Sequence, residues 1–167
     1  MNNTSAGQEF IDADSAAPTI SAGLRRDPWY QAQEILSHRD HSAHELRVKL
    51  QRRGFKAADI DEVMNKLTRL HLIDDEKFAA LVVAETLRFK PVGPRWLINK
   101  LQQKGIAHEF IEPAVYDVID DAKEIELARA AADSWRRSHP RHATDQQRVI
   151  RFLVSRGFSY EAAATVI

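Results

Sequence analysis

The chain has 167 residues, of which 44% are hydrophobic and 29% are charged, with six glycines, six prolines and no cysteine. These proportions are typical of a folded, mostly helical protein, and they exclude a disulfide scaffold and a thiolate zinc site. The 24 basic and 24 acidic residues balance to zero net charge, which taken alone argues against a nucleic-acid partner. The sequence shows neither a secretory signal nor an apolar run of about 18 residues, so we expect a cytoplasmic protein without a membrane span.

The amino-terminal segment, residues 1–26, is rich in alanine, serine and acidic residues and has only scattered apolar side chains. A segment of this composition buries too little apolar surface to offset the entropy cost of ordering. We therefore predict a disordered tail over residues 1–26.

The first predicted repeat covers residues 27–73 and holds three helices. Asp27-Pro28 is typical of a helix start, because aspartate caps the free amide groups and proline fits the first turn. Ser42-x-x-Glu45 is a capping box that predicts the start of a second, central helix. The third helix shows one apolar face with helical spacing, formed by Ile60, Val63, Met64, Leu67 and Leu70.

The second predicted repeat covers residues 74–120 and has the same order of elements. Asp74 is expected to cap its first helix. Gly93-Pro94 places a proline at the first position of its central helix, where the missing amide hydrogen is not needed. The third helix carries Phe110, Ile111, Ala114, Val115, Val118 and Ile119.

The third predicted repeat covers residues 121–167, and a His-Pro pair at 139–140 ends its first helix. The start of its central helix has two candidates. Thr144-x-x-Gln147 forms a capping box, and Asp145 is the alternative cap.

The central helices of the three repeats end in the same pattern, in which two apolar residues four apart are followed four residues later by glycine and an apolar residue. The glycines are 51 and 52 residues apart, so the pattern is a structural period. Glycine favours the left-handed conformation that ends a helix, and the next side chain then packs back on the helix. The copies are Leu46-x3-Leu50-x3-Gly54-Phe55, Leu97-x3-Leu101-x3-Gly105-Ile106 and Val149-x3-Leu153-x3-Gly157-Phe158. The sequence therefore predicts an all-α, elongated tandem array of three three-helix repeats.

Charge is segregated along the chain despite the zero total. Residues 39–56, 88–104 and 136–156, which contain the central helices, hold 17 of the 24 basic residues and only three acidic ones. Residues 109–126 hold seven acidic residues and one lysine. We therefore predict a basic surface that recurs in each repeat and binds an acidic partner or nucleic acid. The candidate binding residues are Arg39, Arg47, Lys49, Arg52, Arg53, Arg95, Lys100, Lys104, Arg148, Arg151 and Arg156.

An alternative applies to three of these candidates. Arg53, Lys104 and Arg156 directly precede the helix-ending glycines, where a cation stabilises the helix dipole by about 0.3 to 1 kcal/mol without any partner. The sequence leaves this alternative open.

Three stretches of the chain resemble the RecX family of recombination regulators. The stretch His38-Arg39-Asp40-His41-Ser42-Ala43-His44-Glu45-Leu46 is similar to the opening motif of that family. Leu72-Ile73-Asp74-Asp75-Glu76-Lys77-Phe78-Ala79 is similar to its Asp-Asp-x-x-Phe segment. Gly93-Pro94-x-x-Leu97-x3-Leu101-x2-Lys104-Gly105-Ile106 is similar to its middle-repeat signature. The resemblance covers residues 28–167 in order.

The resemblance implies a non-enzymatic regulator that binds the RecA recombinase, chiefly its filament on single-stranded DNA. It implies inhibition of strand exchange, ATP hydrolysis and co-protease activity, and thus regulation of DNA repair, homologous recombination and the SOS response. The expected partners are the RecA filament and, as a further option, DNA itself. We expect a monomer and predict no catalytic residue and no cofactor.

Two rival functions are weaker. Three helices with a glycine turn resemble a helix-turn-helix DNA-binding unit, but the helix after the turn carries acidic residues, among them Asp59, Asp61 and Glu62 in the first copy. The histidines His38, His41 and His44 have a spacing that suggests metal ligands. The predicted cap at Ser42 places the first histidine in a different element from the last, so a metal site is not expected.

Overall fold

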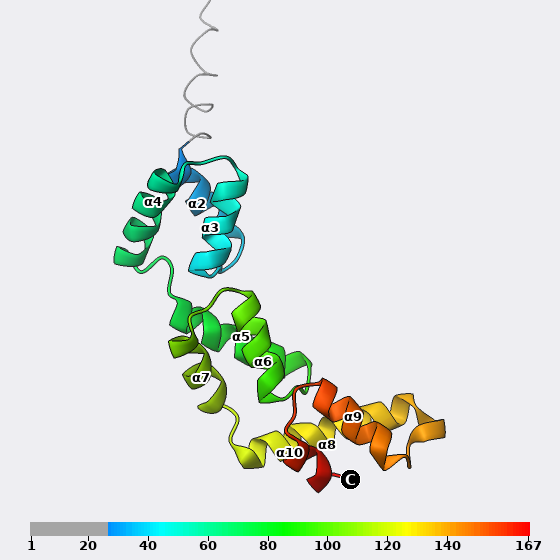
Figure 1. The fold of residues 1–167 in the computed structure, drawn as a ribbon. Helices are drawn as coiled ribbons and strands as arrows, with labels where there is room; N and C mark the ends of the chain where they lie inside the picture. Colours follow the sequence, from blue (N-terminus) through cyan, green and yellow to red (C-terminus); the bar gives the residue numbers. More distant parts are fainter. Residues whose placement is uncertain (1–26) are drawn as a thin grey trace, which may run out of the picture.

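The computed structural model describes residues 27–167, and every regular element in that part of the chain is a helix. The helices follow one another in three groups of three, so the predicted all-α tandem array is confirmed, and the array is elongated and bent (Figure 1). The predicted disordered tail lies outside the described residues. Repeat 1 has helices α2 (Pro28–His38), α3 (Ala43–Arg52) and α4 (Ala57–Arg69). Repeat 2 has helices α5 (Asp75–Phe89), α6 (Pro94–Gln103) and α7 (His108–Tyr116). Repeat 3 has helices α8 (Asp121–Ser138), α9 (Gln146–Ser155) and α10 (Tyr160–Thr165), with a 3-10 turn η1 (Pro140–His142) between α8 and α9.

Most of the helix starts follow from the residues that cap them. The side chains of Asp27, Ser42 and Asp74 each accept a hydrogen bond from a backbone amide in the first turn of α2, α3 and α5, as predicted. The capping box predicted at Thr144 is wrong, because Asp145 caps α9 by accepting from the amide of Arg148 at 3.1 Å. A carboxylate satisfies the amide and also favours the positive end of the helix, an advantage that the neutral threonine lacks.

The three helix-ending glycines have the left-handed conformation that the repeated pattern predicts. Gly54, Gly105 and Gly157 have φ angles of +86°, +72° and +85°. The amide after each glycine donates back to the carbonyl five residues earlier, at 3.4, 3.2 and 3.2 Å in chain order. This bond closes a Schellman turn and tucks the following apolar residue against the helix.

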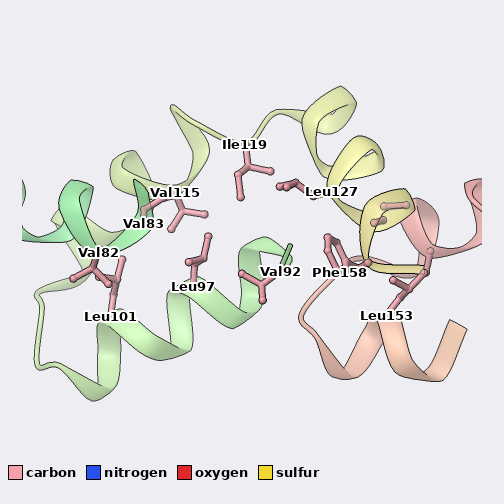
Figure 2. Close-up of a cluster of buried hydrophobic side chains, with 14 of the residues drawn as sticks. Val82, Val83, Val92, Leu97, Leu101, Val115, Ile119, Leu127, Leu153 and Phe158 are labelled. Carbon is pink, nitrogen blue, oxygen red and sulfur yellow. The ribbon is translucent and has the colours of Figure 1, made fainter. Parts of the chain in front are cut away.

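The buried apolar side chains form two separate clusters. Repeat 1 has its own cluster, centred on Leu46, Leu50, Ile60 and Leu67. Repeats 2 and 3 share the other cluster, which runs without interruption from α5 to the C-terminus. Figure 2 shows this shared cluster, in which the side chain of Phe158 from repeat 3 lies beside Val92 of repeat 2. The core therefore divides the array into one repeat and one pair of repeats.

Candidate functional site

Repeats 2 and 3 are joined by backbone contacts between their central helices. The amide groups of Gly93 and Arg95, at the start of α6, donate to the carbonyl groups of Arg156 and Gly157, at the end of α9, at 3.0 and 3.1 Å. The first amides and last carbonyls of a helix have no partner within the helix, so the two helix ends satisfy each other.

Repeats 1 and 2 meet in the same head-to-tail manner. The hydroxyl group of Ser42, at the start of α3, donates to the carbonyl of Lys104, at the end of α6, at 2.6 Å. The side chain of His44 lies so close to Gly105 that a Cβ atom on this glycine would be 2.3 Å from the imidazole ring. At both joints, the start of one central helix thus packs against the glycine turn of the following repeat.

These two joints align α9, α6 and α3 in one column along one side of the array, whereas α4, α7 and α10 lie along the other side (Figure 1). Each central helix buries one apolar stripe, for example Leu46 and Leu50 of α3. The opposite stripe is exposed, and we call its residues the column face. They are His44, Gln51, Arg52, Arg95, Asn99, Gln102, Gln103, Gln147, Arg151, Val154 and Ser155.

The column face contains no carboxylate. Its charged residues are Arg52 on α3, Arg95 on α6 and Arg151 on α9, and none of the three forms an ion pair with another described residue. Acidic residues such as Asp61 and Glu112 lie on the helices of the other side. The exposed stripe along α3, α6 and α9 is therefore basic and holds no carboxylate.

Five of the predicted binding residues are engaged by acidic partners within the chain. Glu45 accepts from Arg39 at 3.0 Å and from Lys104 at 2.8 Å. The remaining pairs are Arg47 with Asp61, Arg53 with Glu34, and Arg148 with Asp145. Such pairing reduces the positive potential that these residues offer to a partner.

The other predicted residues beside the column face are less exposed or contact aromatic rings. Lys49 is half-buried on α3. Lys100 donates to the hydroxyl of Thr86 at 2.7 Å, and burial, together with the charges of Lys104 and Lys90, lowers the pKa of Lys100. The guanidinium group of Arg156 lies 5.3 Å from the Phe152 ring, within cation–π range. These residues flank the three exposed arginines.

The register of the repeats separates two kinds of basic residue. Aligning the glycines places Arg53, Lys104 and Arg156 at one equivalent position, and the structure places all three at helix C-caps. Their recurrence thus agrees with the helix-dipole alternative as well as with binding. The three arginines of the column face, Arg52, Arg95 and Arg151, occupy different positions in the repeat, but each points away from the buried stripe of its helix. A sequence alignment of the repeats hides this common direction.

A basic and aromatic segment beside the joint between repeats 2 and 3 is absent from the residues predicted from the sequence. Arg88, Phe89 and Lys90 end α5, only a few residues before Gly93, and the Phe89 side chain is 70% exposed. Arg88 and Lys90 lie in a basic window that the sequence did indicate. The exposure of Phe89 has no signal in the sequence, because apolar residues of this size are usually buried.

His41 is a buried polar residue next to the joint between repeats 1 and 2. The residue is 3% exposed, its Nδ1 atom is 2.9 Å from the carbonyl of Arg39, and its Nε2 atom has no hydrogen-bond partner among residues 27–167. Burial lowers the pKa of His41 below its usual value of 6.5, and the nearby Arg39 and Lys49 charges act in the same direction, while the bond to the Arg39 carbonyl acts against them. The folded chain therefore favours neutral His41.

We expect stability to fall as the solution is acidified below the usual histidine pKa. The unfolded chain binds the His41 proton more tightly, so the contribution of His41 is complete above pH 6.5 and is lost as the pH falls through its lowered pKa. One linked proton gives a slope of at most about 1.4 kcal/mol per pH unit. Urea unfolding between about pH 5 and pH 8 checks this, and replacing His41 with asparagine should flatten that slope. An unchanged slope in the variant would assign the pH dependence to other groups.

The histidine spacing that suggested a metal site does not bring the rings together as ligands. His41 is buried, His44 packs on Gly105, and no group of three or more histidine and acidic residues suited to a metal ion occurs within residues 27–167. None of the helices in these residues has both the length and the apolar character needed to cross a membrane.

Comparison with known proteins accounts for the three repeats one by one. Models of the first, second and third three-helix domains of RecX match residues 30–67, 74–115 and 122–167. The chain belongs to the RecX family. The relatives carry the name "Regulatory protein RecX", which supports a regulatory role for this chain.

The relatives differ in length. The RecX protein of Chlorobaculum tepidum is 33% identical over 143 residues, which cover 85% of this chain and 87% of the relative. That of Vibrio parahaemolyticus is 31% identical over 146 residues, covering 87% and 88%. A relative from Listeria monocytogenes is 29% identical over 93% of this chain but only 56% of its own length, so the chain spans about half of this longer protein.

Solved RecX structures have the same fold. The crystal structure of RecX from Lactobacillus salivarius superposes with a TM-score of 0.75 at 24% identity, covering 87% of this chain and 95% of that one. A second crystal structure, of a regulatory protein RecX, gives a TM-score of 0.77 at 23% identity over 98% of this chain and 80% of that one. At these identities the likeness concerns the fold alone.

Proposed function

We propose that this RecX family protein regulates the RecA recombinase by binding its filament on single-stranded DNA and inhibiting strand exchange, ATP hydrolysis and co-protease activity. The observation that carries the proposal is the column face, a carboxylate-free basic surface that crosses all three repeats. The family resemblance supplies the identity of the partner, and the face supplies a surface that fits acidic protein or DNA phosphate. The chain acts as a monomer in the cytoplasm and needs no cofactor or catalytic residue.

The length of the column explains how modest contacts add up to useful affinity. Each central helix has ten residues, so the path along the three helices is about 45 Å long. We expect a surface of this length to touch more than one subunit of the filament. Once one repeat is bound, the next two bind at a high effective concentration, which raises the overall affinity above that of any single repeat.

The test is a triple charge reversal on the column face, Arg52→Glu, Arg95→Glu and Arg151→Glu. We expect filament affinity to fall about tenfold or more, since three attractive charges become repulsive, and inhibition of ATP hydrolysis to fall in parallel. The matched control is Lys56→Glu, Arg69→Glu and Arg129→Glu, which makes the same change in net charge at exposed residues outside the column face. Titrations against RecA filaments on single-stranded DNA and against bare DNA measure both effects.

Equal losses in the two triple variants would assign binding to net charge and would overturn the column-face proposal. Equal affinity for bare DNA and for the filament, without any effect on ATP hydrolysis, would favour the alternative in which the protein acts on DNA directly. The helix-turn-helix form of that alternative is disfavoured, because Asp59, Asp61 and Glu62 lie on α4, the helix that would enter the groove, where they would repel DNA phosphate.

A further inference from the structure

The two joints of the array differ in what surrounds them. The joint between repeats 2 and 3 lies within one continuous apolar cluster, to which Val92 and Phe158 both belong (Figure 2). The joint between repeats 1 and 2 lies between two separate clusters. Apolar burial is the main stabilising contribution in a packed interface. The first joint, between repeats 1 and 2, therefore lacks the apolar burial that stabilises the second joint, between repeats 2 and 3.

Polar contacts hold repeat 1 against repeat 2. Besides the bond from Ser42 to the Lys104 carbonyl, the amide of Ala43 donates to the Asp75 carboxylate at 2.8 Å, and the Lys104 ammonium group donates to Glu45 at 2.8 Å. Each such contact contributes little net free energy, because water offers the same groups comparable partners when the joint opens.

Glu45 makes the ion pair among these contacts. Its side chain is 20% exposed and lies between Arg39 and Lys104, whose side chain is 23% exposed. Burial raises the pKa of Glu45, but the hydrogen bonds from Lys104 and Arg39 outweigh burial and leave the pKa below its usual value. The carboxylate is therefore ionised at neutral pH, and it occupies two cations that lie beside the column face.

The equivalent position in the next repeat has the opposite chemistry. Glu45 precedes Leu46 as Trp96 precedes Leu97, and Trp96 packs directly against Gly157, where a Cβ atom would be 2.3 Å from the Trp96 amide nitrogen. The Trp96 side chain is partly buried against the shared apolar cluster, a contact that does not depend on which ions are present. A carboxylate can be displaced by another anion.

The linker between the repeats begins with a turn of the same kind as the glycine turns, in which the Leu72 amide donates to the Leu67 carbonyl at 2.9 Å. His71, between α4 and α5, has a φ angle of +52° and is the one residue other than glycine with positive φ among residues 27–167. Leu70 and Leu72 on either side of it are about half exposed. Ile73, the buried apolar residue of the linker, belongs to the cluster of repeat 1, so the linker adds no side chain to the cluster of repeats 2 and 3 that would resist a change of angle.

We propose that the joint between repeats 1 and 2 is a hinge, that Glu45 is its latch, and that a polyanion bound along the column face opens it by competing for Lys104 and Arg39. The hinge is inferred from contacts within the free protein alone. The competition rests on the proposed function, because it needs an anionic partner at the column face.

The absence of cysteine makes the hinge directly measurable. Cysteines introduced at Asn65, Glu112 and Ala164, each exposed on the third helix of its repeat, carry spin labels in pairs across either joint. Distance distributions from double electron–electron resonance should be broader across the first joint than across the second. Lys104→Met should broaden and shift the first distribution only, and Lys104→Arg should restore it.

The control for the latch is Lys123→Met, which removes an ion pair with Glu126 within α8 and should leave both distributions unchanged. Equal, narrow distributions across both joints, unaffected by Lys104→Met, would overturn the hinge.

Adding single-stranded oligothymidylate tests the competition. The first distribution should then shift toward that of Lys104→Met, while the second stays fixed. Oligonucleotide binding without this shift would overturn the competition and leave the hinge. Failure of the oligonucleotide to bind would overturn the proposed DNA contact and the competition together, while the measurements on the free protein would still decide the hinge.

Discussion

Replacing Gly157 with alanine is expected to lower the free energy of unfolding by about 4 kcal/mol, whereas the same change at Gly54 should lower it by about 1.5 kcal/mol. Both glycines end a central helix with nearly the same φ angle, +85° and +86°, so both alanines bear the same left-handed strain. The sites differ in their surroundings. A Cβ atom at Gly157 would be 2.3 Å from the amide nitrogen of Trp96, and one at Gly54 would have no atom within 4 Å. The difference between the two losses in free energy of unfolding measures the steric cost of crowding the contact between Gly157 and Trp96.

Chemical denaturation of the two variants checks this prediction, and Gly93→Ala separates strain from crowding. Gly93 has an ordinary φ of −84°, yet a Cβ atom there would lie 2.3 Å from the backbone of Gly157. Its loss should therefore be steric alone, about 1 to 3 kcal/mol. Equal losses of unfolding free energy at Gly54 and Gly157 would show that the joint between repeats 2 and 3 accommodates the added Cβ atom without an energetic cost.

Truncation of Phe158 to alanine should cost about 3 to 5 kcal/mol, because the side chain is fully buried in the shared cluster. Since that cluster continues through repeats 2 and 3, the loss should be felt in both. Leu50→Ala removes a fully buried side chain from the separate cluster of repeat 1 and should cost about 2 to 5 kcal/mol there.

Amide hydrogen exchange followed along the chain distinguishes the two truncations. Phe158→Ala should speed exchange in α5 to α10 and leave α2 to α4 protected, and Leu50→Ala should do the reverse. A variant that speeds exchange uniformly through all three repeats would mean that the array unfolds as one unit, in conflict with the division of the core.

The features that the sequence predicts correctly are those decided within a few residues. Ser42 and Asp74 cap helices because each side chain meets an amide in the next turn, and Gly105 ends α6 because only glycine adopts its conformation without strain. The sequence left the cap of α9 undecided between Thr144 and Asp145 for the same reason, because two adjacent residues can reach the same amides. The candidate arginines of the column face also came from local composition, and their role stays a prediction.

The features that the sequence does not reveal depend on distant partners. Glu45 was predicted to complete a capping box, but its side chain turns to Lys104, 59 residues away. Gly93 reads as a residue before a helix-starting proline, yet its lack of a side chain serves the contact with Gly157. The division of the core follows from which helices pack together, and an apolar pattern that repeats almost identically in each unit does not encode it.

The order of helices in the column also gives the array an electrical direction. Because α9, α6 and α3 lie head to tail, their dipoles point the same way, and at both joints the negative end of one helix meets the positive end of the next. The two outer ends carry matching charges, with the Asp145 carboxylate at the positive start of α9 and Arg52 at the negative end of α3. An array with a fixed polarity that binds a polymer with its own polarity has one favoured orientation out of two.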